Sequence, residues 1–425
     1  MKTHEVFGIA PEVTEHSYVD RGDLDATFRK LIERQQTHVA IRGVSKAGKS
    51  WLRQRVLSDP IVVQCRLSYT TVDIYRDALA RLDIQTKVER TISSTFEGKI
   101  TAAGEAGMKF LAKASGELEA SASRESSVTQ QVIGKDIHDL EFIASIIKAS
   151  GRKLVVEDFH YLSVEEQRKF AFDLKTLWDY KTFVVVVGVW ISENMLITLN
   201  PDLSDRIEEI AVTWNTSDLK KVLNKGCNAL NLKMSVPVAD RLAEISYESV
   251  GLLQKLALRL LDELHITQSS PGKPVLIDKL EAVDDAGMHV ADQLNQLYQA
   301  FAKRVADGIR TRKNSTGIYA HAVAAVMAAD DKDLTDGLSA RAIYTVASAK
   351  QPRIQLGNLK IALARIPELQ VDNDGRGLVL AYDPTGEKVS AVDKQLLLYR
   401  KFATVKWPWE DLINEIPDQD DRYQV

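Results

Sequence analysis

Short apolar runs alternate with segments of helical periodicity along the first half of the chain. The predicted strands are residues 37–41, 61–65, 154–158 and 182–189. The predicted helices between them are residues 24–34, 51–57, 71–82, 137–147 and 163–178. Uninterrupted apolar runs are typical of strands buried on both faces, and apolar residues three and four apart are typical of a helix with one buried face. Strands that alternate with helices predict an α/β fold with a parallel sheet.

Helical periodicity dominates after this region. Ser163 and Glu166 are spaced as a capping box at the start of the last helix above. Further helices are predicted at 217–225, 237–245 and 250–264, which together match a small helical lid. The Ser, Pro and Gly content of residues 269–274 predicts a linker, and a long helix is predicted from residue 278 to about 310.

Residues 315–415 have the pattern of a separate module. Helices are predicted at 319–328, 340–349 and 356–366, before strand-like segments at 369–372 and 378–382. The Asp374-Gly375 pair between those segments is a hairpin signal. Three helices followed by a hairpin is the plan of a winged helix. The aromatic side chains near the end are expected to pack onto the body of the protein: Tyr399, Phe402, Trp407 and Trp409.

These patterns predict the domain organisation. The parts are a core at 1–215, a helical lid at 216–270, a linker helix with a basic end at 271–314, a winged helix at 315–415 and an acidic tail at 416–425. Within the core, residues 88–132 have too few large apolar side chains for a core of their own. Two interpretations remain: a long β-hairpin or helical excursion, or a flexible surface insertion. We expect this insertion to be poorly ordered or to project from the body.

Composition narrows the class of protein. Of the 425 residues, 45% are hydrophobic and 27% are charged, and the formal net charge is −4, so a nucleic-acid surface would have to be a local patch. The two cysteines, Cys65 and Cys227, cannot build a disulfide framework. The N-terminus has no apolar signal core, and the longest apolar run is too short to span a bilayer. We therefore expect a cytoplasmic protein without a membrane segment.

One motif carries specific chemistry. Residues 43–50 fit the pattern G-x-x-x-x-G-K-[ST] and lie between a predicted strand and a predicted helix, as a phosphate-binding loop requires. Glycines allow the backbone N–H groups to form an anion nest, and the helix N-terminus adds its positive end. Lys49 would contact the β- and γ-phosphates, and the Ser50 hydroxyl would be a Mg²⁺ ligand. The predicted nucleotide-binding residues of this segment are Gly43, Val44, Ser45, Lys46, Ala47, Gly48, Lys49, Ser50 and Trp51.

A pair of acids supplies the expected partner of this loop. Glu157 and Asp158 end the apolar strand that begins at Leu154. An acid at such a position holds Mg²⁺ through water, and the next acid can orient or deprotonate the attacking water. We assign the metal side to Glu157 and water activation to Asp158. The usual order is Asp then Glu, and the shorter Asp158 predicts slow hydrolysis.

Taken together, the loop at 43–50, the two acids, Arg206, the lid and the terminal winged helix resemble one family of proteins. It is the AAA+/STAND-like P-loop ATPases, a group that includes origin-recognition and initiator-type proteins and archaeal ATPases. The resemblance covers about residues 15–266 by motif order, and for the winged helix it rests on pattern alone. It implies an α/β parallel-sheet P-loop core, ATP and Mg²⁺ as cofactors, and assembly into a homo-oligomer on ATP binding. Members of this group couple that state to DNA or to an effector protein, and prokaryotic members are frequent in mobile-element and antiphage systems.

The resemblance also implies roles for residues outside the loop. Tyr18 and Val19 would line the adenine pocket, with simple packing of the first helix as the equal alternative. Arg206 would reach the nucleotide of a neighbouring subunit, the alternative being a surface salt bridge to Asp205 or Glu209. A polar residue after the strand at 182–189 would sense the γ-phosphate, for which Ser192 and Asn194 are candidates. Gln254 and Lys255 stand where a lid arginine is usual, which puts lid sensing in doubt.

Two hypotheses for the output remain. In the first, an ATPase engages duplex DNA through the winged helix and a basic cluster, as helix-turn-helix proteins do. The proposed DNA contacts are Arg310, Arg312, Lys313, Lys360 and Arg376. In the second, nucleotide binding assembles a protein-interaction switch that recruits an effector without DNA. We find no metal-site or serine-hydrolase spacing that favours another enzyme class, and His160 beside the acids is interpreted as a packed neighbour.

Overall fold

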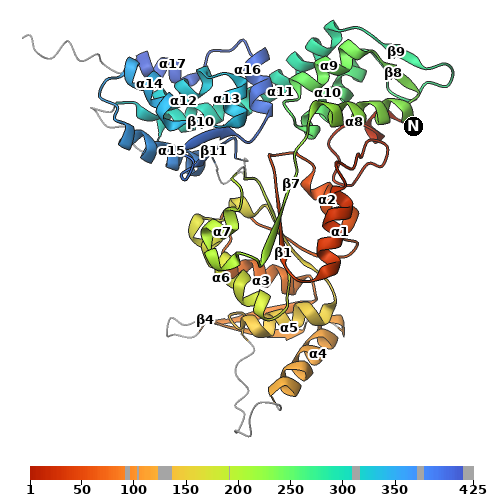
Figure 1. Cartoon of the computed structure of the whole chain (residues 1–425), viewed down its shortest axis with the longest axis vertical. Helices are drawn as coiled ribbons and strands as arrows, with labels where there is room; N and C mark the ends of the chain where they lie inside the picture. Colours follow the sequence, from red (N-terminus) through yellow and green to blue (C-terminus); the bar gives the residue numbers. More distant parts are fainter. Residues whose placement is uncertain are drawn as a thin grey trace, which may run out of the picture. The chain divides into compact units, whose positions relative to one another are not determined.

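The computed structural model describes residues 1–90, 96–102, 105–122, 136–190, 192–308, 316–370 and 378–414. The chain divides into two units. The sheet unit comprises residues 20–43 and 49–212, and the helical unit comprises residues 1–19, 44–48 and 213–425. Figure 1 labels their helices and strands.

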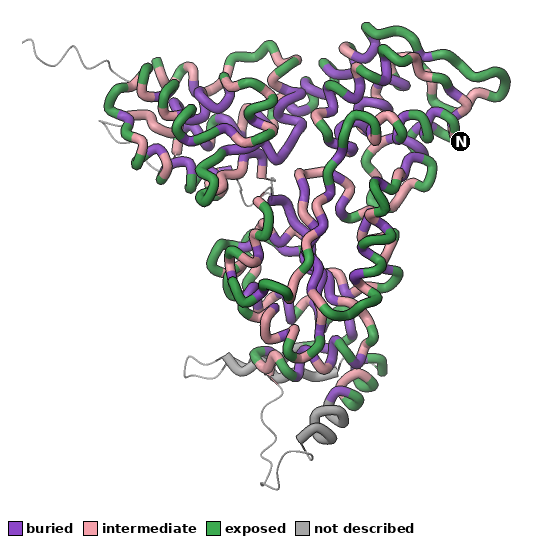
Figure 2. The backbone as a smooth tube through the Cα atoms, in the orientation of Figure 1, coloured by how far each residue is buried: buried purple, intermediate pink, exposed green. Residues whose placement is uncertain are grey.

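A five-stranded parallel sheet forms the centre of the sheet unit (Figure 1). Its strands are β1 (His38–Arg42), β2 (Ile61–Gln64), β5 (Leu154–Glu157), β6 (Val185–Gly188) and β7 (Ile207–Ala211). Their order is β2-β5-β6-β1-β7, so β1 pairs with β6 on one side and β7 on the other. Every position of β5 and β6 is buried, as the apolar runs predict for central parallel strands. In Figure 2 buried stretches run through the middle of the sheet unit, with exposed stretches around them.

Helices pack against this sheet and complete its core. They are α1 (Leu24–Arg34), α2 (Lys49–Val56), α3 (Thr71–Ala80), α5 (Leu140–Ser150), α6 (Val164–Asp179) and α7 (Met195–Leu199), with short 3₁₀ turns η2 (Phe159–Tyr161) and η3 (Pro201–Leu203). The predicted capping box of α6 is half correct: the Ser163 hydroxyl accepts from the Glu166 N–H. The Glu166 carboxylate instead accepts from the N–H and hydroxyl of Thr71. A bond to another helix has therefore replaced the local one.

The described part of the insertion contains both kinds of secondary structure that the sequence left open. Strands β3 (Ile84–Arg90) and β4 (Phe96–Ala102) pair antiparallel, and helix α4 (Glu105–Ala122) follows. Gly107, in the first turn of this helix, lies close to the backbone of Asp83. A Cβ at Gly107 would lie only 2.4 Å from the Asp83 carbonyl oxygen. Residues 91–95, 103–104 and 123–135 lie outside the described residues, so the predicted flexibility stays a prediction.

The first part of the helical unit contains the predicted lid helices. Its elements are η1 (Thr3–Glu5), α8 (Thr216–Ala229), β8 (Leu232–Met234), α9 (Val236–Ile245), α10 (Val250–Glu263), β9 (Val275–Ile277) and α11 (Glu281–Asp307). The strands β8 and β9 pair in parallel across the predicted linker, which the sequence pattern did not indicate. The basic end predicted for the long helix falls largely on residues 309–315, which lie outside the described residues.

The C-terminal part begins with three longer helices. Its elements are α12 (Ile318–Ala328), α13 (Asp331–Asp336), β10 (Leu338–Ser339), α14 (Ala340–Lys350), α15 (Leu356–Gln370), β11 (Leu380–Asp383), β12 (Lys388–Ala391), α16 (Gln395–Phe402) and α17 (Pro408–Asn414). The three strands form a sheet in the order β10-β12-β11. The winged helix predicted for this part stays a prediction.

The predicted hairpin of this module was wrong in its first strand. Leu369 and Gln370 end α15 instead of forming a strand, and the observed hairpin joins β11 to β12. The Gln370 side chain explains the difference, because its oxygen accepts from the N–H groups of Val379 and Leu380. Its amide donates to the Leu380 carbonyl, so the end of α15 is tied directly to β11. The predicted turn at Asp374-Gly375 lies outside the described residues.

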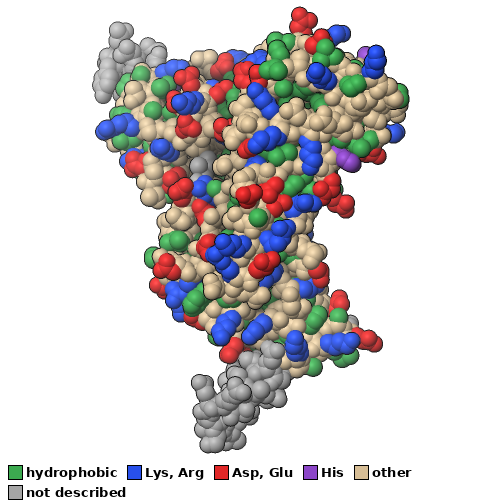
Figure 3. Space-filling view, turned by 45° about the vertical axis from the view of Figure 1, so that its right-hand side comes forward, with side chains coloured by type: hydrophobic (Ala, Val, Ile, Leu, Met, Phe, Trp, Pro, Cys, Tyr) green, Lys and Arg blue, Asp and Glu red, His purple; other side chains and the backbone are tan. Residues whose placement is uncertain are grey.

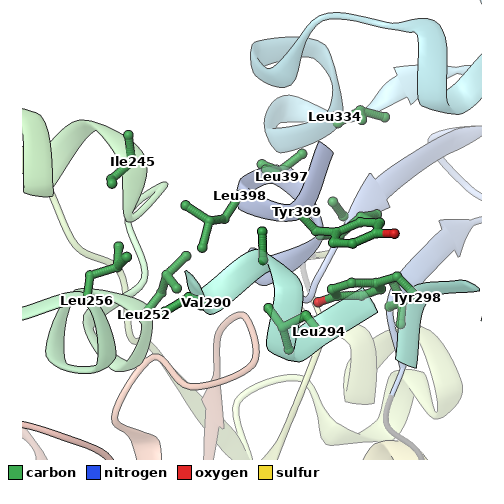
Figure 4. Packing of buried hydrophobic residues seen from close by; sticks show 14 of the residues in the cluster. Ile245, Leu252, Leu256, Val290, Leu294, Tyr298, Leu334, Leu397, Leu398 and Tyr399 are labelled. Carbon is green, nitrogen blue, oxygen red and sulfur yellow. The ribbon is translucent and has the colours of Figure 1, made fainter. Parts of the chain in front are cut away.

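One large apolar core runs through the helical unit. Figure 4 shows residues of α10, α11 and α16 packed together, among them Leu252, Val290 and Leu398. The aromatic packing predicted for the tail is confirmed: Tyr399 and Trp409 are buried, and the rings of Trp407 and Trp409 stack at 4.5 Å. Among the described helices, none has the length and apolar character needed to cross a membrane.

Candidate nucleotide site

The phosphate loop begins and ends in the sheet unit. Gly43 follows β1, and Lys49 and Ser50 form the first turn of α2, so the strand–loop–helix context is confirmed. Lys49 is buried, and its Nζ donates to the Gly43 carbonyl oxygen at 3.1 Å. Ser50 is exposed at the N-terminus of the helix. A cationic amine and a hydroxyl at this point are suited to a phosphate and its metal.

The middle of the loop, Val44–Gly48, is held by groups of the helical unit. The Ala47 carbonyl accepts from the Trp214 indole at 2.8 Å, and the Lys46 carbonyl accepts from the Gly251 N–H at 3.0 Å. The Ser45 N–H donates to the Val392 carbonyl at 2.9 Å. Lys46 has a φ of 60°, which is unusual for a residue with a side chain. These contacts fix the loop backbone, and the sequence motif alone does not predict them.

Both predicted acids lie at the carboxyl end of β5. Glu157 is buried and forms an ion pair with Arg53 of α2, with 3.1 Å between Nε and Oε1. Burial and the charge of Glu157 raise the pKa of Asp158, and the charge of Lys49 opposes them. Asp158 and Lys49 thus interact electrostatically, as expected for two parts of one site. A raised pKa makes a carboxylate a better proton acceptor.

Arg53 is a further residue of the site, and the sequence motifs do not identify it. Arg53 stands four residues after Lys49, one helical turn further along α2, and that spacing could have indicated a second cation on the same face. Its guanidinium compensates the buried charge of Glu157, which would otherwise be costly.

The donors fit Mg²⁺. The Ser50 hydroxyl and the Glu157 carboxylate are hard oxygen ligands, the kind that Mg²⁺ prefers. The described residues contain no group of three or more His, Cys, Asp or Glu side chains arranged as a metal cage. A site with few protein ligands is typical of Mg²⁺ that is bound together with phosphates. When bound, the metal would neutralise phosphate charge between these two side chains.

Two candidates for sensing the γ-phosphate follow β6. The Asn194 N–H donates to the Glu209 carboxylate at 3.2 Å, and Asn194 has a φ of 55°. Glu209 also accepts from the Arg42 guanidinium at 2.5 Å. The loop after β6 is thus tied to β7 and to the end of β1. The role predicted for Ser192 or Asn194 stays a prediction.

Arg206 lies at the opposite edge of the sheet from the phosphate loop of its own chain. It directly precedes β7, and its carbonyl accepts from the His38 N–H at the start of β1. Its guanidinium stands 4.9 Å from the Trp178 ring centre and donates to the Asp202 carbonyl. Neither carboxylate of the alternative salt bridge, Asp205 or Glu209, pairs with it in the described structure. Arg206 therefore belongs to no site with Lys49 in the same sheet unit, and action on another subunit stays a proposal.

The residues predicted to line the base pocket lie in the helical unit. Tyr18 is buried and its carbonyl accepts from the Lys225 amine at 2.7 Å, while Val19 packs against the apolar core. Gln254 is buried and donates to the Ser17 hydroxyl, which gives it a structural partner. Burial and the charge of Lys46 lower the pKa of Lys255, so this lysine of α10 lies within electrostatic reach of the loop. The adenine contacts of Tyr18 and Val19 remain a prediction.

Four of the five proposed DNA contacts lie outside the described residues: Arg310, Arg312, Lys313 and Arg376. Lys360 of α15 is paired with Glu387 at 2.6 Å. The exposed face of α15 is mixed, with Arg365, Glu368 and Ile361, which is 57% exposed. On the face that Figure 3 shows, acidic and basic side chains are interspersed.

Comparisons with known proteins bear on the fold of this chain. No family model and no curated protein matches the chain. A Walker-type ATPase of Pyrococcus abyssi is 11% identical, with a TM-score of 0.54, over 93% of this chain and 99% of that one. Aeropyrum pernix ORC1 in complex with DNA is 11% identical with a TM-score of 0.39, over 90% of this chain and 92% of that one. A STAND protein of Pyrococcus horikoshii with a tetratricopeptide repeat sensor is 12% identical with a TM-score of 0.36, over 98% of this chain and 44% of that one.

The first of these likenesses shows the fold. The chain has an α/β P-loop core with the architecture of the Walker-type ATPase, and this confirms the predicted fold of the core. The identity is too low to transfer a substrate, a partner or an activity.

Proposed function

We propose that this protein binds ATP with Mg²⁺ at the loop 43–50, hydrolyses it, and uses the nucleotide state as a switch. The observation that carries the proposal is the placement of Lys49, the first residue of α2, within electrostatic reach of Asp158, which directly follows β5. A phosphate loop and two acids at the carboxyl edge of one parallel sheet are what phosphoryl transfer to water requires.

Each side chain of the site would have a distinct role in ATP binding or hydrolysis. Lys49 would leave the Gly43 carbonyl and bind the β- and γ-phosphates. Ser50 and Glu157 would hold the metal, with Glu157 sharing its charge with Arg53. Asp158 would accept a proton from the attacking water, for which its raised pKa suits it. Because this acid is one methylene shorter than the usual Glu, the expected hydrolysis is slow.

The experiment is a measurement of ATP binding and turnover by the purified protein, beside Lys49→Ala and Asp158→Asn. Lys49→Ala should abolish binding, whereas Asp158→Asn should retain binding and lose turnover. Binding that survives Lys49→Ala would contradict the proposed site. Turnover that survives Asp158→Asn would remove the role of Asp158 and leave the site itself intact.

The output of the switch has two candidates. The order of elements from α12 to β12 supports a winged helix, a fold that binds duplex DNA through its third helix. The pairing of Lys360 with Glu387, and the presence of Glu368 as well as Arg365 on the exposed face of α15, favour a protein partner instead. A titration with duplex DNA at low salt decides between them. DNA binding that weakens with salt and with Arg365→Glu supports the first candidate.

We also propose that ATP binding assembles the protein, with Arg206 acting on the nucleotide of a neighbouring subunit. An arginine adds a fork of donors to phosphate charge, and Arg206 is absent from the site of its own chain. Mixing Arg206→Ala with Lys49→Ala should restore turnover to part of the wild-type value, because some interfaces would then combine an intact loop with an intact arginine. No recovery in a mixture that still assembles, measured by light scattering, would contradict this arrangement.

A further inference from the structure

His160 lies at the carboxyl edge of the sheet, between the ends of two neighbouring strands. It belongs to η2, directly after β5, and its Nδ1 accepts the N–H of Val189, which follows β6, at 3.2 Å. A backbone N–H can only donate, so Nδ1 carries a lone pair in this contact. The hydrogen of the neutral ring is therefore on Nε2. From the sequence, His160 was expected to be a packed neighbour of the acids, and the contact with Val189 gives its ring a defined tautomer.

The Nε2 side of the ring differs from the Nδ1 side. In the part of the chain that the structure describes, no group accepts a hydrogen bond from Nε2–H. The Tyr161 ring lies against the imidazole, with centroids 4.3 Å apart. Burial and the charge of Lys49 lower the pKa of His160 to about 3, so the ring remains neutral at ordinary pH. His160 is thus a fixed N–H donor within electrostatic reach of the phosphate-loop lysine.

We propose that the Nε2–H of His160 donates a hydrogen bond to the terminal phosphate of bound ATP. The proposal rests on the proposed function, because it presupposes a nucleotide at Lys49. An oxyanion next to a lysine amine is the acceptor that such a donor suits best. Asp158, two residues before it, makes no hydrogen bond to His160 in the described structure. His160 would then perform the sensing that the sequence analysis expected of Ser192 or Asn194, whose loop is held by Glu209.

The test compares two amide substitutions of equal chemistry and different reach. The amide of His160→Gln can stand near the position of Nε2 and donate there. In His160→Asn the shorter amide reaches only the position of Nδ1, where it can still accept from Val189. We expect His160→Asn to lower kcat by about 10- to 100-fold, the usual effect of losing one hydrogen bond to a charged group. His160→Gln should recover a large part of that loss, and His138→Asn, at an exposed position, is the matched control.

Binding of a non-hydrolysable ATP analogue and of ADP is measured on the same variants. His160→Asn should weaken the binding of the analogue and leave the affinity for ADP unchanged, since ADP lacks the terminal phosphate. Equal losses of kcat in His160→Asn and His160→Gln would overturn the proposal and leave a structural role. Equal losses of affinity for the analogue and for ADP in His160→Asn would do the same. If the wild-type protein binds neither nucleotide, the proposed function itself fails, and this inference fails with it. If only the histidine effects are absent, the proposed function stands.

Discussion

Lys46 of the phosphate loop forms an ion pair with Asp393, two residues before the start of α16, with 3.7 Å between Nζ and Oδ1. The neighbouring Ser45 N–H and Val392 carbonyl bond to each other, so the two segments are joined by charge and by backbone. The Asp393 carboxylate also accepts from the Tyr298 hydroxyl at 3.0 Å, in the core that Figure 4 shows. A negative charge therefore stands beside a loop whose predicted ligand is an anion.

Asp393→Asn should strengthen the binding of both ATP and ADP. Removing a repulsive charge of about 1 kcal/mol corresponds to about fivefold in affinity at low salt, and the gain should shrink at high salt. A fluorescent-nucleotide titration at several salt concentrations measures it. Tyr298→Phe removes the hydroxyl and retains the carboxylate, so its affinity should equal that of wild type. Weaker binding by Asp393→Asn would mean that the carboxylate orders the loop for its ligand.

Gly251→Ala should disturb the phosphate loop from a distance of 205 positions along the chain. A Cβ at Gly251 would lie 2.6 Å from the Lys46 Cβ and 3.0 Å from the Lys46 carbonyl, so the loop has to shift. Overpacking of this kind costs about 1–3 kcal/mol, and the hydrogen bond from Gly251 to Lys46 would weaken as well. Urea unfolding and ATP titration measure the two effects. Gly357→Ala is the control, since a Cβ there meets nothing within 4 Å.

Arg53→Met should destabilise the protein more in the absence of Mg²⁺ and ATP than in their presence. It leaves the buried Glu157 carboxylate without its charged partner, a loss of about 3 kcal/mol in comparable buried pairs. A metal bound at Glu157 would replace the missing positive charge and reduce that loss. The melting temperatures of variant and wild type with and without Mg²⁺ and ATP test this.

The control for Arg53→Met is on the same helix. Arg55 pairs with Asp25 at 3.7 Å, and its side chain is 38% exposed, so Arg55→Met should cost less than about 1 kcal/mol. If the loss in Arg53→Met is the same with and without the nucleotide and metal, Glu157 is not on the metal side.

His38 should make the protein less stable as the pH falls from neutral toward 4. The ring is buried between the Leu174 carbonyl and the Val184 N–H, and burial lowers its pKa from 6.5 to about 4. Between these values the unfolded chain binds a proton that the folded chain does not. Stability is therefore fully present above pH 6.5 and is lost progressively below it, by about 3 kcal/mol in total.

Unfolding free energies of His38→Asn over this pH range provide the test. The variant starts from a lower stability, but its decline with falling pH should be shallower than that of wild type. The same change at the exposed His138 should leave the decline unaltered. An identical slope in wild type and His38→Asn would show that other groups, such as His160, carry the whole effect.

The limits of prediction are clearest where two parts of the chain compete for one side chain. Glu166 was expected to cap its own helix and instead binds Thr71. Leu369 and Gln370 were expected to begin a hairpin and instead end α15, because Gln370 bonds to both N–H groups at the start of β11. The local sequence spacing is compatible with both alternatives in each case. The observed hydrogen-bond partner comes from a segment far along the chain or beyond a turn.

The sequence by itself determined four strands of the parallel sheet (β1, β2, β5 and β6), the phosphate loop and the two acids. These features are local: an apolar run buries itself in a sheet, and residues 43–50 are contiguous, so their chemistry follows from their order. The tertiary structure alone decided that Arg53 neutralises Glu157, that Val189 sets the tautomer of His160, and that Asp393 pairs with Lys46. Those contacts join residues separated by 29 to 347 positions. These contacts depend on which strands become neighbours and where helices pack. The periodicity of a single segment does not predict either.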